Sequence, residues 1–237
     1  MKNQYYGDVN DYRKYGLLRC LARDPGFIVG VCWMLTSDDR RTDGRLISYA
    51  VDPKRWRSYD PPLFDSLSAV LASGRKRDVS LASKAGLIPG ALFFEQLLPN
   101  NRASREAYFS EMLRVLAPAS LIFFDPDNGL EVRSKRPGTR GSCKYLYWSE
   151  LEGAYSDGHS VLVYQHFPRE GRSGFTRRIV DSLQQRLAGA ETYALRTSHV
   201  VYFLAVHPKH APSIQAGLRM ISREWPGQIE LVPGLAA

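Results

Sequence analysis

Residues 27–35 form a run of nine residues without a charged side chain, rich in β-branched and aromatic types. A strand that covers only one face of a core alternates apolar and polar residues, whereas a strand buried on both faces reads as a continuous apolar run. The run therefore predicts a strand in a parallel sheet with helices on both faces. An amphipathic helix is predicted before it, at residues 12–23, because the turn signal Asp24-Pro25-Gly26 follows directly.

Strand and helix patterns alternate through the rest of the chain. Helices are predicted at residues 63–71, 103–116, 148–155, 175–187 and 211–225, and strands at 92–97, 120–124, 161–167, 191–197, 200–206 and 229–232. Such alternation is typical of a doubly wound sheet with right-handed crossovers. Only Ser198 and His199 separate two of the strands, which is too short for a crossover, so strand 200–206 must run antiparallel. The predicted fold class is α/β, a mostly parallel sheet with a late antiparallel strand in three αβα layers.

The length of 237 residues and the apolar content of 44% suit one large folded domain, so residues 1–237 are predicted to form a single unit. No run of about 18 apolar residues occurs, and the first residues lack the apolar centre of a signal peptide. We therefore expect a cytoplasmic protein without a membrane partner.

Net charge is +8, and the basic residues are grouped along the sequence. A basic surface favours a polyanionic partner, DNA or RNA. The alternative is that these residues form solvated basic faces that only keep the protein soluble, because both cases give the same sequence pattern. The loop at residues 133–144 follows the most prominent polar motif of the chain. Its side chains Arg133, Lys135, Arg136 and Arg140 are the expected phosphate contacts.

That motif is Asp125-Pro126-Asp127-Asn128-Gly129, which comes directly after four apolar residues of a predicted strand. Ligands of open α/β sheets bind at the carboxyl ends of the strands. Carboxylates there can orient an amine, accept a proton or ligate a hard cation, so Asp125, Asp127 and Asn128 are candidate catalytic residues. The alternative is a turn in which these side chains cap backbone groups.

Other polar residues are expected at the same edge of the sheet. His166 ends the predicted strand 161–167 and is a candidate acid, base or ligand, or else a structural histidine. Asp38, Asp39 and Asp43 follow the strand at residues 27–35 and add carboxylates there.

Two features resemble S-adenosylmethionine-dependent methyltransferases. A late antiparallel strand in an otherwise parallel sheet resembles their layout, which implies a class I methyltransferase-like fold. Asp125-Pro126 is similar to the first half of the Asp/Asn-Pro-Pro-Tyr/Phe motif of nucleic-acid amino-group methyltransferases, where it holds the target amine of a flipped base. Asp127 and Asn128 stand where that motif has its second proline and its stacking aromatic.

The N-terminal segment carries a second resemblance. Gly7, Asp11 and Lys14 have the spacing found at the start of bacterial 23S ribosomal RNA adenine-N6 methyltransferases. Lys14-Tyr15-Gly16-Leu17 is similar to a Lys-Tyr-Gly-Leu-like helix that precedes the first strand in three-cysteine-motif partner proteins. The resemblance implies that this segment folds over cofactor and substrate. Asp11 is alternatively an N-cap of the first helix.

The resemblance implies S-adenosylmethionine as the cofactor, with Lys14, Tyr15, Asp38 and Asp39 as its expected contacts. In place of the Gly-rich turn that usually follows the first strand of methyltransferases, this chain has the sequence of residues 34–39, Met-Leu-Thr-Ser-Asp-Asp.

Three functions follow from these patterns. The first is a methyltransferase-like enzyme that acts on nucleic acid. The second is a metal-dependent nuclease or phosphodiesterase that holds Mg²⁺ through Asp125, Asp127 and one of the carboxylates after the first strand. The third is a noncatalytic nucleic-acid-binding relative of the methyltransferase fold, for which loss of the cofactor loop is expected.

Overall fold

A computed structural model describes residues 1–39 and 44–232 of the chain. Its helices are α1 (Val9–Leu21), α2 (Pro53–Trp56), α3 (Pro61–Ala72), α4 (Ser80–Lys84), α5 (Arg102–Val115), α6 (Trp148–Ser156), α7 (Arg172–Arg186) and α8 (Ala211–Glu224). Its strands are β1 (Val29–Cys32), β2 (Leu92–Phe94), β3 (Leu121–Phe124), β4 (Gly129–Leu130), β5 (Tyr145–Leu146), β6 (Ser160–His166), β7 (Glu191–Arg196), β8 (Val200–Val206) and β9 (Glu230–Leu231).

Seven strands form one sheet in the order β2-β1-β3-β6-β8-β7-β9. Strands β1, β2, β3 and β6 are parallel, and β8 runs antiparallel between β6 and β7. This confirms the prediction of an α/β fold with a mostly parallel sheet and an antiparallel strand at residues 200–206. Strand β9 is a further antiparallel strand, paired with β7 at the edge of the sheet.

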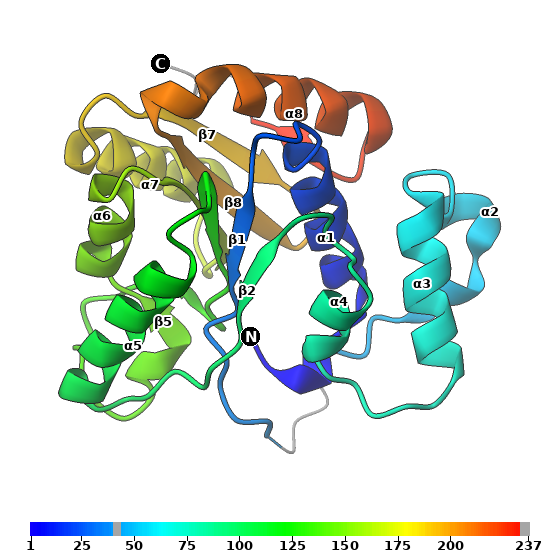
Figure 1. Ribbon diagram of the computed structural model, residues 1–237, viewed down its shortest axis with the longest axis horizontal. Helices are drawn as coiled ribbons and strands as arrows, with labels where there is room; N and C mark the ends of the chain where they lie inside the picture. Colours follow the sequence, from blue (N-terminus) through cyan, green and yellow to red (C-terminus); the bar gives the residue numbers. More distant parts are fainter. Residues whose placement is uncertain (40–43, 233–237) are drawn as a thin grey trace.

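Helices cover both faces of the sheet (Figure 1). On one face, α1, α3 and α8 enclose an apolar cluster that contains Val31, Phe123 and Leu204 of the strands. On the other face, α5, α6 and α7 pack over a second cluster that contains Ile122 and Val163. Successive residues of one strand therefore point to opposite faces of the sheet and are buried in different clusters. This explains why β3 carries no polar side chain.

The strand expected at residues 27–35 is shorter than its apolar run, because β1 ends at Cys32. Trp33 and Met34 are also fully buried, and Met34 takes a left-handed backbone conformation with φ 47°. This conformation interrupts the strand at Met34, and pairing resumes at Leu35, which forms an isolated parallel bridge with Leu97. The apolar run thus reports burial correctly but not the end of the strand.

Helix α1 starts at Val9 because Asp8 caps it: the Asp8 side chain accepts hydrogen bonds from the backbone N–H groups of Asn10 and Asp11. The expectation that Asp11 is the N-cap is therefore wrong. Asp11 lies inside the first turn, and its carboxylate accepts instead from the Gly7 N–H and from Lys14. Capping by Asp8 brings both acidic residues to the start of one helix.

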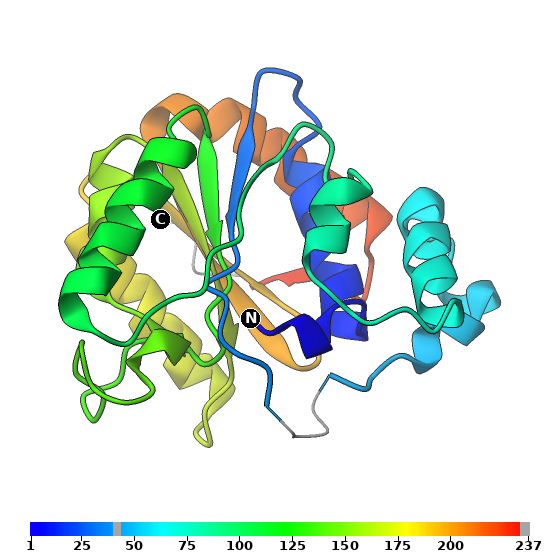
Figure 2. The same cartoon turned by 60° about the horizontal axis from the view of Figure 1, so that its bottom comes forward.

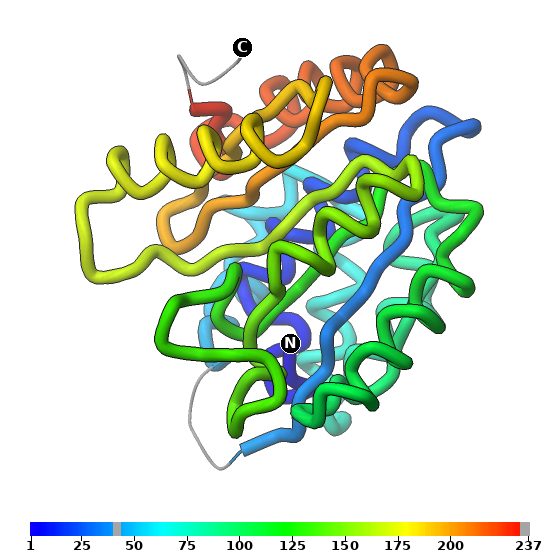
Figure 3. Tube along the Cα trace, turned by 90° about the vertical axis from the view of Figure 1, so that its left-hand side faces the viewer, coloured from blue at the N-terminus to red at the C-terminus, as the bar shows by residue number. Residues whose placement is uncertain are grey.

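Residues 1–8 lie at the carboxyl edge of the sheet, where the N-terminus is marked in Figures 2 and 3. The Thr36 N–H donates to the Met1 carbonyl at 2.9 Å, which ties the segment to the turn after β1. Across residues 1–39 and 44–232, no helix has the length and apolar content needed to cross a bilayer.

Helices α1 and α8 approach closely at Gly16, where an added Cβ would lie 1.9 Å from the buried ring of Trp225. We expect Gly16→Ala to lower the free energy of unfolding by about 1–3 kcal/mol, because overpacking outweighs the gain in helix propensity. Gly153→Ala in α6 is the control: its Cβ meets no atom within 4 Å, so it should raise stability by about 0.5–1 kcal/mol. Urea unfolding measures both, and a stabilised Gly16→Ala would contradict the packing described.

Candidate functional site

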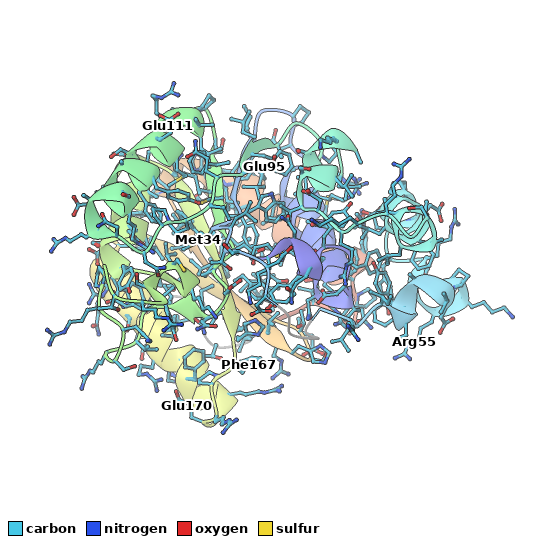
Figure 4. The ribbon with its side chains drawn as sticks, turned by 90° about the horizontal axis from the view of Figure 1, so that it is seen from below. Met34, Arg55, Glu95, Glu111, Phe167 and Glu170 are labelled. Atoms are coloured by element: carbon cyan, nitrogen blue, oxygen red, sulfur yellow. The ribbon has the colours of Figure 1, made fainter. Side chains whose placement is uncertain are left out.

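A cavity of about 1030 Å³ lies at the carboxyl ends of β3 and β6. Its walls come from residues 1–14, 44–46, 125–133, 144–145 and 164–179. Figure 4 looks onto this edge of the molecule: Phe167 and Glu170, which both line the cavity, lie close together after β6, and Met34 lies further toward the centre. The position is the one expected for a ligand site of an open α/β sheet.

Lys14 lies at the floor of the cavity and is fully buried. Its ammonium is 2.8 Å from the Asp11 Oδ1 atom and 2.6 Å from the Asp125 Oδ2 atom, and it lies 5.0 Å from the centre of the Tyr164 ring. Burial disfavours the charged lysine, but the two carboxylates outweigh this effect and raise the pKa of Lys14 above its ordinary value. The lysine is therefore a fixed cation rather than a proton donor near neutral pH.

Asp127 is the second carboxylate of the motif, and its side chain is also buried. The Met1 ammonium lies 2.8 Å from its Oδ1 atom, and the Thr36 hydroxyl donates to its Oδ2 atom at 2.6 Å. Burial opposes ionisation, yet the ammonium and this hydrogen bond hold the pKa of Asp127 below its usual value. Asp127 is thus an ionised carboxylate that is already paired.

Asn128 is exposed and lines the cavity beside Asp127. Its backbone N–H donates to the Lys144 carbonyl at 2.9 Å, and its carbonyl accepts from the Gln165 side chain at 3.2 Å. These bonds fasten the motif to the segment before β5 and to β6. The backbone of Asn128 is held while its side chain stays accessible.

Asp8 is a cavity residue that the sequence analysis did not select. It is 7% exposed, and its burial together with the negative charge of Asp11 raises the pKa of the Asp8 carboxyl to about 7. A buried carboxyl that titrates near neutral pH inside a cavity is a candidate functional group. The sequence does contain a signal for this role. Asp8 and Asp11 are acidic residues three positions apart at the start of a predicted helix, and in such a pair the first residue is the cap.

Six residues selected from the sequence line the cavity: Lys14, Asp125, Asp127, Asn128, Arg133 and His166. His166 is exposed, and its ring lies 5.1 Å from that of Tyr164. The other candidates lie elsewhere. Tyr15 is fully buried beneath the cavity, with its hydroxyl donating to Asp11, and Asp39 pairs with Lys2 at 2.7 Å.

Asp38 is exposed and accepts a hydrogen bond from the Gln4 backbone N–H, and neither it nor Asp39 is part of the cavity wall. Asp43 lies outside the described residues.

Of the four basic residues selected as phosphate contacts, Arg133 lines the cavity, while Lys135, Arg136 and Arg140 lie further out on the same loop. The Lys135 ammonium donates to the Arg140 carbonyl at 3.3 Å. Lys144 at the end of the same loop also lines the cavity, and Arg45 and Arg178 from distant segments complete the basic rim.

A Mg²⁺ site of the kind expected for a nuclease does not fit this donor set. Asp125 is paired with Lys14, and Asp127 with the Met1 ammonium and Thr36. Within residues 1–39 and 44–232, no group of three or more His, Cys, Asp or Glu is arranged to hold a metal ion.

S-adenosylmethionine does not fit the turn after β1 in this arrangement. Trp33 and Met34 fill the turn with buried side chains, and Met1 lies against it, with its ammonium 3.4 Å from the Met34 carbonyl. None of residues 33–36 lines the cavity. The turn therefore lacks the close backbone approach that a Gly-rich turn gives to a nucleoside cofactor.

Comparison with known proteins assigns no family, because no family model, no curated protein and no solved structure matches the chain.

Substitution of the buried Lys14 tests whether its ion pairs with Asp11 and Asp125 stabilise the fold. We expect Lys14→Met to lower the free energy of unfolding by about 3–5 kcal/mol, because it leaves two buried carboxylates without their cation. The exposed Lys54 of α2 is the control, where the same change should alter stability by less than about 0.5 kcal/mol. Equal unfolding midpoints in urea for the two variants would show that the Lys14 ion pairs do not stabilise the fold.

Proposed function

We propose that the chain binds nucleic acid and that one nucleotide enters the cavity, with its base toward the acidic floor and its phosphates against the basic rim. The observation that carries this proposal is the separation of charge within one cavity. The buried floor holds three carboxylates, Asp8, Asp11 and Asp125, against the single cation Lys14, which pairs with the last two. The exposed or half-buried rim holds the cations Arg45, Arg133, Lys144 and Arg178. A ligand that is anionic at one end and rich in hydrogen-bond donors at the other matches this arrangement.

Aromatic side chains in the wall support the same proposal. Tyr164, Phe167 and Phe175 all line the cavity, and Phe167 is flanked by the Arg172 guanidinium at 4.5 Å from its ring centre. Aromatic rings beside a basic groove are the usual means of holding an unstacked base. The cavity volume of about 1030 Å³ is ample for one nucleotide.

The positive charges of the rim are only partly neutralised by carboxylates. The Arg178 guanidinium pairs with Glu170 at 2.8 Å, whereas Arg133 makes no ion pair with another described residue. An incoming phosphate would thus find at least one cation without competition.

A second candidate function is amino-group methylation of nucleic acid with S-adenosylmethionine. The sheet order favours it, because antiparallel β8 lies between β6 and β7, and Asp125-Pro126 follows β3, the strand next to β1. The filled turn after β1 opposes it. Calorimetric titration of the protein with S-adenosylmethionine, and separately with Mg²⁺, distinguishes the candidates. We expect no binding heat from either. Saturable heat from S-adenosylmethionine would show cofactor binding and favour the methyltransferase, and saturable heat from Mg²⁺ would favour the metal-dependent nuclease.

Binding to single-stranded DNA or RNA should weaken with added salt, because phosphate contacts release counterions. Replacing Arg133 and Lys144 together by alanine should reduce the slope of log affinity against log salt by about 1.4, which is about 0.7 for each lost contact.

Lys54→Ala with Arg75→Ala is the matched control, since both residues are exposed and lie outside the cavity wall. It removes the same charge and should leave the slope nearly unchanged. An equal effect of the two double variants would mean that net charge, and not the rim, governs binding.

A further inference from the structure

We infer that a second cavity, separate from the one at the carboxyl edge of the sheet, binds a small molecule that carries a phosphate monoester. The second cavity has a volume of about 540 Å³ and lies where α1 and α8 end and α3 begins. The two cavities share no wall residue, so the inference goes beyond the proposed function. The charged residues in the wall of the second cavity are Arg19, Arg23, Asp60, Arg223 and Glu224.

This wall holds three arginines but only two carboxylates. Arg19 and Asp60 form one pair, in which the guanidinium Nε atom lies 2.6 Å from the Oδ2 atom. Glu224 is shared, because its carboxylate lies 3.1 Å from the Arg23 guanidinium and 3.0 Å from that of Arg223. Within the residues that the structure describes, neither of these two arginines pairs with another carboxylate. One positive charge in the wall therefore has no carboxylate of its own.

The carboxylate oxygens of the wall are already used as acceptors. Asp60 accepts on Oδ1 from the Leu63 backbone N–H at 3.1 Å and on Oδ2 from Arg19 at 2.6 Å. Glu224 accepts from one guanidinium on Oε1 at 3.0 Å and from the other on Oε2 at 3.1 Å. A ligand that donates hydrogen bonds would thus have to compete with arginines for each of these oxygens.

Hydrogen-bond donors of the same wall remain available to a ligand. The Nε and Nη1 groups of Arg23 and Arg223 donate no hydrogen bond to a described residue. The hydroxyl groups of Ser58 and Tyr59 donate none to a described residue either, and the Tyr59 oxygen only accepts, from Gln228 at 3.4 Å. Free donors, used acceptors and one excess positive charge together match an anionic ligand that is rich in acceptors.

A phosphate monoester fits this wall better than a carboxylate or a phosphodiester. It presents three free acceptor oxygens and nearly two negative charges above about pH 7, because its second pKa is about 6. A carboxylate or a phosphodiester presents only about two free oxygens and one charge. Guanidinium groups also bind phosphate through two parallel hydrogen bonds.

The rest of the wall is suited to the organic part of such a ligand. Pro61, Pro62 and Pro226 line the cavity together with Tyr59. The Tyr59 ring is held in place by stacking on the buried Trp225, with ring centres 5.4 Å apart and planes 20° apart. Rigid apolar side chains beside a charged group are typical of small-molecule sites.

The test is heteronuclear NMR of the whole protein at constant ionic strength above about pH 7, where the monoester is doubly ionised. Methyl phosphate is the probe, and dimethyl phosphate is the matched diester. Methyl phosphate should shift the backbone amide signals of residues 58–60 and 223–225 in a saturable manner. Dimethyl phosphate should bind at least about tenfold more weakly, because it lacks one charge-assisted hydrogen bond. Unmoved signals, or equal affinity of the two probes, would overturn the inference.

Arg23→Gln with Arg223→Gln is the decisive double variant. Both residues are exposed, so the fold should be kept, and urea unfolding checks this. Affinity for methyl phosphate at the second cavity should fall at least about tenfold. Arg133→Gln with Lys144→Gln is the matched control: it removes the same charge from the rim of the other cavity and should leave this affinity unchanged.

The outcomes separate this inference from the proposed function. Equal weakening by the two double variants would show that net charge alone attracts the phosphate, which would overturn the inference. Shifts confined to residues 128–133 and 144–145 would also overturn it, and would leave binding at the carboxyl edge intact. Shifts at residues 58–60 and 223–225 that persist in the control variant would support it, even if no nucleic acid binds to the protein.

Discussion

The ammonium of Lys14 between Asp11 and Asp125 joins the first helix to the central strand β3. A charge buried to this degree is tolerated only when its partners are fixed, so the pair sets how α1 lies on the sheet. The same position requires that Gly16, half a turn further along the helix, meets the ring of Trp225 with no side chain between them. Ion pairing at Lys14 and close packing at Gly16, both near the middle of α1, therefore define a single placement of the helix.

Placement of α1 in turn determines where the preceding residues run. Arg77 donates to the carbonyls of Tyr5, Tyr6 and Gly44, and the Tyr49 hydroxyl donates to the Gly7 carbonyl. These bonds hold residues 1–8 across the carboxyl edge of the sheet as one wall of the cavity.

The opposite wall is held by a second buried cation. Arg105 of α5 pairs with Glu150 of α6 and donates to the carbonyls of Ser142 and Tyr145, while the Asn100 side chain accepts from the Gly141 N–H. The end of the basic loop is thus fixed near the cavity, and its middle extends away from it. This is why Lys144 lies at the rim and Arg136 does not.

Much of the fold could be predicted from the sequence, because burial leaves a local pattern. The apolar runs at β1, β3 and β6 predicted buried parallel strands, the short join at residues 198–199 required an antiparallel β8, and the polarity change at Asp125 predicted the edge where the cavity lies. Each of these properties depends on neighbouring residues alone.

The composition of the site was decided by tertiary structure. Lys14 and Asp125 are 111 positions apart, and the sequence around either residue does not indicate that their side chains are in contact. The cap at Asp8, the filled turn after β1 and the rim residues Arg45 and Arg178 likewise depend on contacts between distant segments. The sequence by itself determined which apolar segments are buried and at which edge of the sheet the cavity lies, since these follow from the hydrophobic pattern and from the change of polarity after a strand. Which charges pair and which cations surround the cavity were decided only by the folded chain, because electrostatic and hydrogen-bond partners are set by distance in space and not by distance along the sequence.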